Sequence, residues 1–159
     1  MLHTPDPAHL RRAIELAQDN VRCGRGGPFA AVIVRNGQIV AEGANSVTST
    51  QDPTAHGEVN AIRNACKTLG TFTLAGCEIY TSCEPCPMCL AAIYWARLGA
   101  IYYGSNQQDA AAAGFDDATL YEEVRKGSTE RSIPATQLLQ DEAWSVFAVW
   151  QEMEGKIEY

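Results

Sequence analysis

Three cysteines spaced three residues apart occur in the stretch TSCEPCPMC, at positions 83, 86 and 89. Zn²⁺ prefers thiolate and imidazole ligands in a tetrahedral arrangement. Cys86 and Cys89 can reach the same ion, because residues three apart on the first turn of a helix share one face. A helix N-terminus also favours the thiolate form that binds metal. A single Cys-x-x-Cys pattern nevertheless occurs in redox motifs and zinc knuckles too, so the cysteines alone leave the function open.

A histidine and a glutamate lie about thirty residues upstream, at positions 56 and 58. Taken singly, His56 is compatible with a hydrogen-bonded residue at a helix start, and Glu58 with a first-turn carboxylate favoured by the helix dipole. With Pro-Cys-x-x-Cys they form the signature of zinc deaminases, in which the glutamate is not a ligand. His56, Cys86 and Cys89 then leave a fourth position for water, as in catalytic zinc sites.

This combination predicts a hydrolytic deaminase with one Zn²⁺ per chain. Zinc lowers the pKa of its bound water toward ~7, and Glu58 is the catalytic residue that takes the proton and returns it as a general acid. Cys83 could complete a closed structural site, but Glu58 would then have no role, so we expect Cys83 to be a small residue at a strand end. Three further cysteines are interpreted as small buried hydrophobic residues: Cys23, Cys66 and Cys77.

The elements that must position these residues can be read from the hydrophobic pattern. An amphipathic helix over 6–24 precedes two β-rich runs in 28–45, which are joined by the hairpin signal Asn36-Gly37. A helix over 52–70, opened by Asp52 or Thr54, leads to a strand, a helix and another strand, at 77–82, 86–99 and 100–105. Helices are expected over 107–114, 115–127 and 141–156, and a further strand is expected over 133–139. Strands linked through helices indicate an α/β fold. In such folds, ligand-binding and catalytic sites lie where strand ends meet helix N-termini.

Length and composition limit the possible partners. The 159 residues suit one domain, 1–159, and no apolar run reaches the ~18 residues of a membrane span. The N-terminus lacks the basic start and apolar centre of a signal peptide, so we expect a cytoplasmic protein with reduced thiols. The net charge is −7 and the arginines are scattered, whereas a nucleic-acid-binding surface needs a basic stripe. A small neutral substrate fits better than a nucleic acid.

Almost the whole chain resembles the bacterial guanine deaminases of the cytidine-deaminase-like superfamily. The similar stretches are GGPFAAVIV, DPTAHGEVNAIRNACKTLG, YTSCEPCPMCLAAIYWAR, AAAAGFDDATLYEEV and the terminal KIEY. The resemblance implies a three-layer α/β/α sandwich with a mixed central sheet, zinc-dependent hydrolysis of guanine to xanthine and ammonia, and a homodimer. It also implies that the tail, about 155–159, crosses to the partner subunit. In one departure, Gly57 replaces the family's usual alanine, and we expect little loss of chemistry.

The resemblance also implies roles for five substrate-binding residues. Asn45 hydrogen-bonds the purine, Phe29 packs against its ring, Asp117 recognises the guanine edge, Tyr159 closes the pocket and Trp95 lines it. Each has a simpler interpretation from the residues alone: Asn45 as a turn residue, Phe29 and Trp95 as core, Asp117 as a helix cap and Tyr159 as part of a frayed tail.

Other functions remain compatible with the motif. Guanosine deaminases are similar over the same stretches, and tRNA adenosine deaminases share the zinc and the glutamate but must bind a polyanion. A non-enzymatic alternative is a zinc-stabilised interaction domain, which would have a closed site with four ligands.

Overall fold

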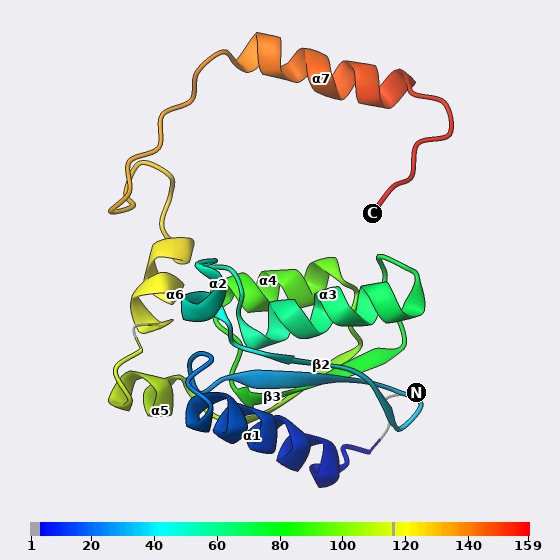
Figure 1. The fold of residues 1–159 in the computed structure, drawn as a ribbon. Coiled ribbons are helices and arrows are strands. Elements are labelled where there is room, and N and C mark those ends of the chain that lie inside the picture. The colour runs from blue at the N-terminus through cyan, green and yellow to red at the C-terminus, as the bar shows by residue number, and fades with distance from the viewer. Residues whose placement is uncertain (1–3, 116) are drawn as a thin grey trace. The chain divides into compact units, whose positions relative to one another are not determined.

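The computed structural model describes residues 4–115 and 117–159, and the chain divides into two compact units. The first unit ends at Tyr121 and the second is Glu122–Tyr159. Helices and strands follow in the order α1 (Pro7–Arg22), β1 (Ala30–Arg35), β2 (Gln38–Ala44), α2 (Val47–Thr50), α3 (Gly57–Leu69), β3 (Cys77–Cys83), α4 (Pro87–Trp95), β4 (Ala100–Ser105), α5 (Gln107–Ala112), α6 (Asp117–Arg125) and α7 (Gln140–Glu152) (Figure 1). Within the described residues, no helix has the length and apolar character needed to cross a bilayer.

The central sheet is mixed, as predicted, with the strand order β2-β1-β3-β4. Strand β1 is antiparallel to both of its neighbours, whereas β3 and β4 are parallel. The β1–β2 turn consists of Asn36 and Gly37, with φ angles of 51° and 75°. Two consecutive positive φ angles are typical of the type I′ hairpin turn, which confirms the Asn-Gly signal.

Both faces of the sheet are covered, α1 lying on one side and α3 and α4 on the other (Figure 1). Ala31 and Ile33 of β1 pack into the core on the α3/α4 side, while Val32 and Val34 pack toward α1. Alternate residues of a strand point to opposite faces, so a run buried on both sides must be apolar throughout. This accounts for the sequence AAVIV and confirms the expected α/β/α layers.

Helix α3 begins later than expected, and its start determines the position of the metal centre. Asp52 does not open the helix: its Oδ1 accepts hydrogen bonds from the Thr54 backbone N–H and hydroxyl, at 2.8 and 2.6 Å, and so closes an earlier turn. The helix starts at Gly57, with His56 in the N-cap position. It ends as predicted at Gly70, whose φ of 65° is the left-handed conformation favoured at helix ends.

The second unit consists of the end of α6, an irregular segment and α7. The predicted strand over 133–139 is wrong, because these exposed residues form no ladder with any described strand. The irregular segment is tied to α6 by Glu123, whose carboxylate accepts hydrogen bonds from the Ser132 backbone N–H and hydroxyl. Helix α7 has no buried residue, and Gly155, with a φ of 70°, follows its end.

Candidate metal centre and substrate pocket

Two helix N-termini meet at the candidate metal centre. His56 is the N-cap of α3, Cys86 is the N-cap of α4, and Cys89 lies in the first turn of α4. N-cap side chains commonly accept a hydrogen bond from their own helix. Neither His56 nor Cys86 makes such a bond, so both side chains are directed to another partner. The positive ends of the two helix dipoles also favour negative thiolates here.

The three predicted ligands lie close together and fit a zinc ion. Their ligand atoms are all within 4.8 Å of one another, and His56 Nδ1 is 3.7 Å from Cys86 Sγ and 3.5 Å from Cys89 Sγ. Tetrahedral zinc, with Zn–S near 2.3 Å and Zn–N near 2.05 Å, requires an N···S separation of about 3.6 Å. The observed spacings match this value. His56, Cys86 and Cys89 therefore bind Zn²⁺.

The electrostatics of the centre also suit a cation. The hydrogen bond from Cys89, together with those involving His56, lowers the pKa of Cys86 to about 4, so Cys86 readily forms a thiolate. The same hydrogen bond and burial raise the pKa of Cys89 in the absence of metal. The hydrogen bond with Cys86 raises the pKa of His56. Thiol ligands must lose their protons to bind a metal ion, so metal binding at His56, Cys86 and Cys89 releases protons.

Glu58 lies beside the ligands without belonging to them. Its side chain is buried, with 7% of its surface exposed, and its Oε2 is 3.4 Å from Cys89 Sγ. Burial disfavours the charged form and raises the pKa of Glu58. A raised pKa makes this carboxylate a stronger base than an exposed glutamate, which suits general acid–base catalysis.

Gly57 places the first turn of α3 directly against β1. A Cβ atom at this position would lie 2.8 Å from Ala30 Cα and 3.1 Å from Ala30 N. Ordinary Cβ contacts are longer, so a side chain at this position would require the helix or the strand to move. The glycine therefore sets a close approach between the helix that carries His56 and the strand that follows Phe29.

Cys83 lies outside the group of ligand atoms in the described part of the chain. It is buried at the end of β3, and its Sγ donates to the Asn106 carbonyl at 3.7 Å. Burial raises the pKa of Cys83 to about 11, which keeps the thiol protonated.

Of the other cysteines, Cys77 is buried as expected, but Cys23 is exposed, because it follows the last residue of α1 instead of facing the core.

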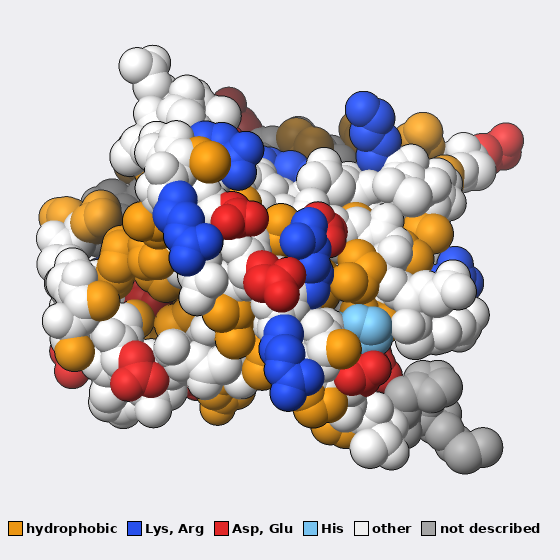
Figure 2. All heavy atoms as spheres, turned by 60° about the horizontal axis from the view of Figure 1, so that its bottom comes forward, with side chains coloured by type: hydrophobic (Ala, Val, Ile, Leu, Met, Phe, Trp, Pro, Cys, Tyr) orange, Lys and Arg blue, Asp and Glu red, His pale blue; other side chains and the backbone are white. Residues whose placement is uncertain are grey.

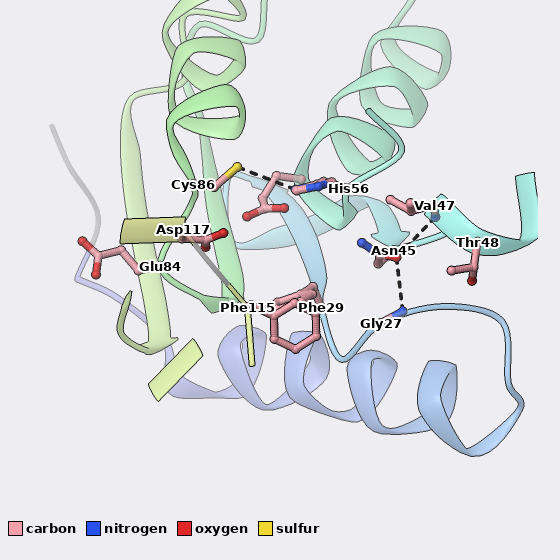
Figure 3. A pocket seen from close by; sticks show the side chains of 11 residues that line it. Gly27, Phe29, Asn45, Val47, Thr48, His56, Glu84, Cys86, Phe115 and Asp117 are labelled. Carbon is pink, nitrogen blue, oxygen red and sulfur yellow. Dashed lines mark hydrogen bonds between the residues drawn. The ribbon is translucent and has the colours of Figure 1, made fainter. Parts of the chain in front are cut away.

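A pocket of about 270 Å³ opens onto the metal centre (Figure 3). This volume lies just below the ~300–1,000 Å³ that is typical of ligand pockets, so the site suits a small ligand. The lining residues come from several segments of the first unit: Gly27, Phe29, Asn45, Val47, Thr48, His56, Glu58, Glu84, Cys86, Phe115 and Asp117.

Asn45 has a fixed orientation in this pocket. Its Oδ1 accepts hydrogen bonds from the backbone N–H groups of Gly27 and Val47, at 3.2 and 3.3 Å (Figure 3). An amide offers one acceptor oxygen and one donor nitrogen. Since the oxygen is held by the backbone, Asn45 presents its Nδ2 donor to a ligand.

Two aromatic rings form one wall of the pocket. Phe29 and Phe115 meet edge to face, with ring centroids 4.7 Å apart and planes at 79°. Sequence reasoning identified Phe29 but missed five other lining residues: Phe115, Glu84, Thr48, Val47 and Gly27. Glu84 accepts hydrogen bonds from the backbone and side chain of Gln107, and in Figure 3 its carboxylate points away from His56 and Cys86.

Asp117 lines the pocket as the first residue of α6. It is therefore inside the helix rather than at its cap, and the preceding position, Asp116, lies outside the described residues. Trp95 does not line this pocket, because it sits at the last position of α4, where it is largely exposed beside Arg97. Tyr159 belongs to the second unit, and its role stays a prediction.

Comparison with known proteins agrees with the geometry of the centre. Residues 3–105 match the model of the cytidine and deoxycytidylate deaminase zinc-binding region. The chain is 55% identical over 150 residues to guanine deaminase of Bacillus subtilis strain 168, covering 94% of this chain and 96% of that protein.

Solved structures show the same relationship. An X-ray structure of guanine deaminase from Bacillus subtilis superposes with a TM-score of 0.94 at 52% identity, covering 98% of this chain and 99% of that one. A further protein, solved as a single-residue variant in complex with 8-azaguanine, has a TM-score of 0.67 at 32% identity, covering 69% of this chain and 63% of that one.

Proposed function

The chain belongs to the cytidine and deoxycytidylate deaminase zinc-binding family, and we infer that it hydrolyses guanine to xanthine and ammonia. The observation that carries this conclusion is the joint presence of three zinc ligands and a buried, non-ligating Glu58 at the base of a purine-sized pocket. The similarity to guanine deaminase over nearly the full length of both chains selects the substrate.

The reaction exchanges an amine for an oxygen at C2 of guanine. Water forms a bond to C2, the bond from C2 to the exocyclic nitrogen breaks, and ammonia leaves. Zinc, when bound, acts as a Lewis acid that makes the water nucleophilic at neutral pH. Glu58 accepts one proton from the attacking water at its carboxylate and returns it to a ring nitrogen of the substrate; it then takes the second proton from the same oxygen, now bonded to C2, and passes it to the leaving amine. Its burial supports this role, because the raised pKa lets the carboxyl group hold the proton between these steps.

We assign the pocket residues to substrate recognition. Asn45 donates a hydrogen bond to an acceptor atom of the purine, since its Oδ1 is engaged by the backbone. Asp117 accepts hydrogen bonds from N–H groups at the guanine edge. Phe29 and Phe115 pack against the ring and exclude water, which strengthens the polar contacts beside them. The bound 8-azaguanine in a related structure supports a purine as the ligand.

A tRNA substrate is less compatible with the charge distribution. A protein that grips a phosphate backbone needs clustered lysines and arginines. The net charge is −7, and on the face shown in Figure 2 basic and acidic side chains are interspersed rather than gathered in a stripe. A structural zinc domain would need a fourth protein ligand, and the ligand group found among residues 4–115 and 117–159 has three.

We further propose a homodimer in which the tail at about 155–159 crosses to the partner subunit. Large contiguous apolar surfaces on a soluble protein usually mark an interface. Large apolar side chains are exposed on each unit of the single chain taken by itself: Tyr94 and Trp95 on α4, and Trp144, Phe147 and Trp150 on α7. A cytoplasmic location is part of the same proposal, and it is supported by the six free cysteines.

The activity is tested by measuring ammonia release from guanine, guanosine, adenine and cytosine by zinc-loaded protein under identical conditions. We expect guanine to be turned over far faster than the other three compounds. Equal or faster release from guanosine would overturn the assignment to the free base, and release from none of the four would overturn the enzymatic function.

A further inference from the structure

Two contacts fix the segment that carries Asp117. On one side, the ring of Phe115 packs edge to face on Phe29. On the other side, the Tyr121 hydroxyl donates a hydrogen bond to the Pro85 carbonyl at 2.6 Å. Asp117 and Tyr121 are four residues apart in α6, so they lie on the same face of the helix. The face that carries Asp117 into the pocket is therefore the face held by Tyr121.

The partner of Tyr121 belongs to the metal-binding loop. Pro85 is buried and directly precedes Cys86, which is a zinc ligand and the N-cap of α4. A buried carbonyl group needs a hydrogen-bond donor, and here the phenol supplies it from 36 residues away in sequence. Burial, and then the negative charge of Glu84, raise the pKa of Tyr121, so the hydroxyl stays protonated and able to donate.

We propose that Tyr121 is a positioning residue, which anchors the first turn of α6 to the loop of Cys86 and thereby sets where Asp117 meets the guanine edge. Tyr121 does not line the pocket, so it acts through Asp117 and not by touching the substrate. The inference rests on the proposed function, because it takes Asp117 as a substrate-binding residue. The inference adds that substrate recognition depends on the hydrogen bond between α6 and the loop that carries Cys86.

The test compares Tyr121→Phe with Tyr103→Phe, which removes a hydroxyl from an exposed tyrosine of β4 outside the pocket. Loss of one buried hydrogen bond should raise KM for guanine about 3- to 10-fold in Tyr121→Phe, with a smaller change in kcat. The Kd for 8-azaguanine, measured by calorimetry, should rise by a similar factor. Zinc content should remain one per chain, and amide exchange in residues 113–125 should become faster. Tyr103→Phe should change none of these quantities.

A double-mutant cycle with Asp117→Asn separates the possible outcomes. If Tyr121 acts through Asp117, its effect on KM disappears in the Asp117→Asn background. Wild-type KM in Tyr121→Phe, or effects of the two substitutions that simply add, would overturn the inference alone. Wild-type KM in Asp117→Asn would instead refute the assignment of Asp117 within the proposed function, and the inference with it.

Discussion

Replacing Asn45 with aspartate tests how the purine is recognised without disturbing the surrounding backbone. Asn45 Oδ1 accepts hydrogen bonds from Gly27 N–H and Val47 N–H, and a carboxylate oxygen can accept both. The backbone of Asn45 also accepts a bond from Asn20 Nδ2 at 2.8 Å, which the substitution leaves in place. Asn45→Asp therefore keeps every protein contact of this residue and changes only the group that faces the pocket.

The change converts a donor into a charged acceptor. On the proposed role of Asn45, Nδ2 of the wild type donates to an acceptor atom of the purine, whereas in Asn45→Asp two acceptors would face each other in a buried pocket. Leaving one buried polar group without a partner costs about 1–3 kcal/mol. At about 1.4 kcal/mol for each factor of ten, this corresponds to a loss in guanine affinity of roughly 5- to 150-fold.

The assay is steady-state ammonia release as a function of guanine concentration, together with zinc content and thermal unfolding. We expect a higher KM in Asn45→Asp, one zinc per chain and a melting temperature close to that of the wild type. The matched control is Asn64→Asp, which makes the same chemical change where Nδ2 donates to the Glu42 carbonyl outside the pocket. Its KM should stay at the wild-type value.

A KM for Asn45→Asp within about twofold of the wild type would refute the reasoning, because the donor would then contribute nothing to binding. An equal rise in KM in Asn64→Asp would refute it as well, since the effect would then follow from added negative charge in general.

Four further results are expected. Glu58→Gln should keep its zinc but lose about 10²- to 10⁴-fold in kcat, because an amide cannot transfer the proton; loss of zinc in metal analysis would show that the ligands are misassigned. A chelator should abolish activity and lower the unfolding temperature, both restored by added Zn²⁺ and neither by Mg²⁺. Cys83→Ala should keep both zinc and activity, and a variant depleted of zinc would make Cys83 a ligand. Deleting 156–159 should impair turnover at full zinc content, and mixing this chain with full-length Glu58→Gln should partly restore activity in mixed dimers; no recovery would mean that each tail serves its own subunit.

The sequence predicted the metal centre well because the information is local. His-x-Glu places a ligand and the catalytic glutamate within one helical turn, and Pro-Cys-x-x-Cys does the same for two ligands. Only the meeting of the two helix ends had to be inferred. Phe115 and Glu84 were missed for the opposite reason. Their places in the pocket depend on contacts with Phe29 and Gln107, which are distant in sequence and belong to other elements.

The wrong predictions also have physical causes. Asp52 and Thr54 are residue types that often cap helices, but here the Asp52 side chain closes a separate turn that precedes the start of the helix at Gly57. The segment 133–139 has apolar residues, yet a strand exists only where a neighbouring strand supplies hydrogen-bond partners, and the sequence pattern does not show whether one is present.

The distribution of the zinc ligands has a consequence for folding. His56 stands at the start of α3, while Cys86 and Cys89 stand at the start of α4, after the chain has returned through β3. Strand β3 pairs with β1 and β4, so the ligands come together only when the sheet is assembled. Zinc therefore binds the native chain far more tightly than the unfolded chain, and its binding free energy adds to the stability of the sheet by mass action. Metal limitation would then deplete the folded protein itself as well as its activity.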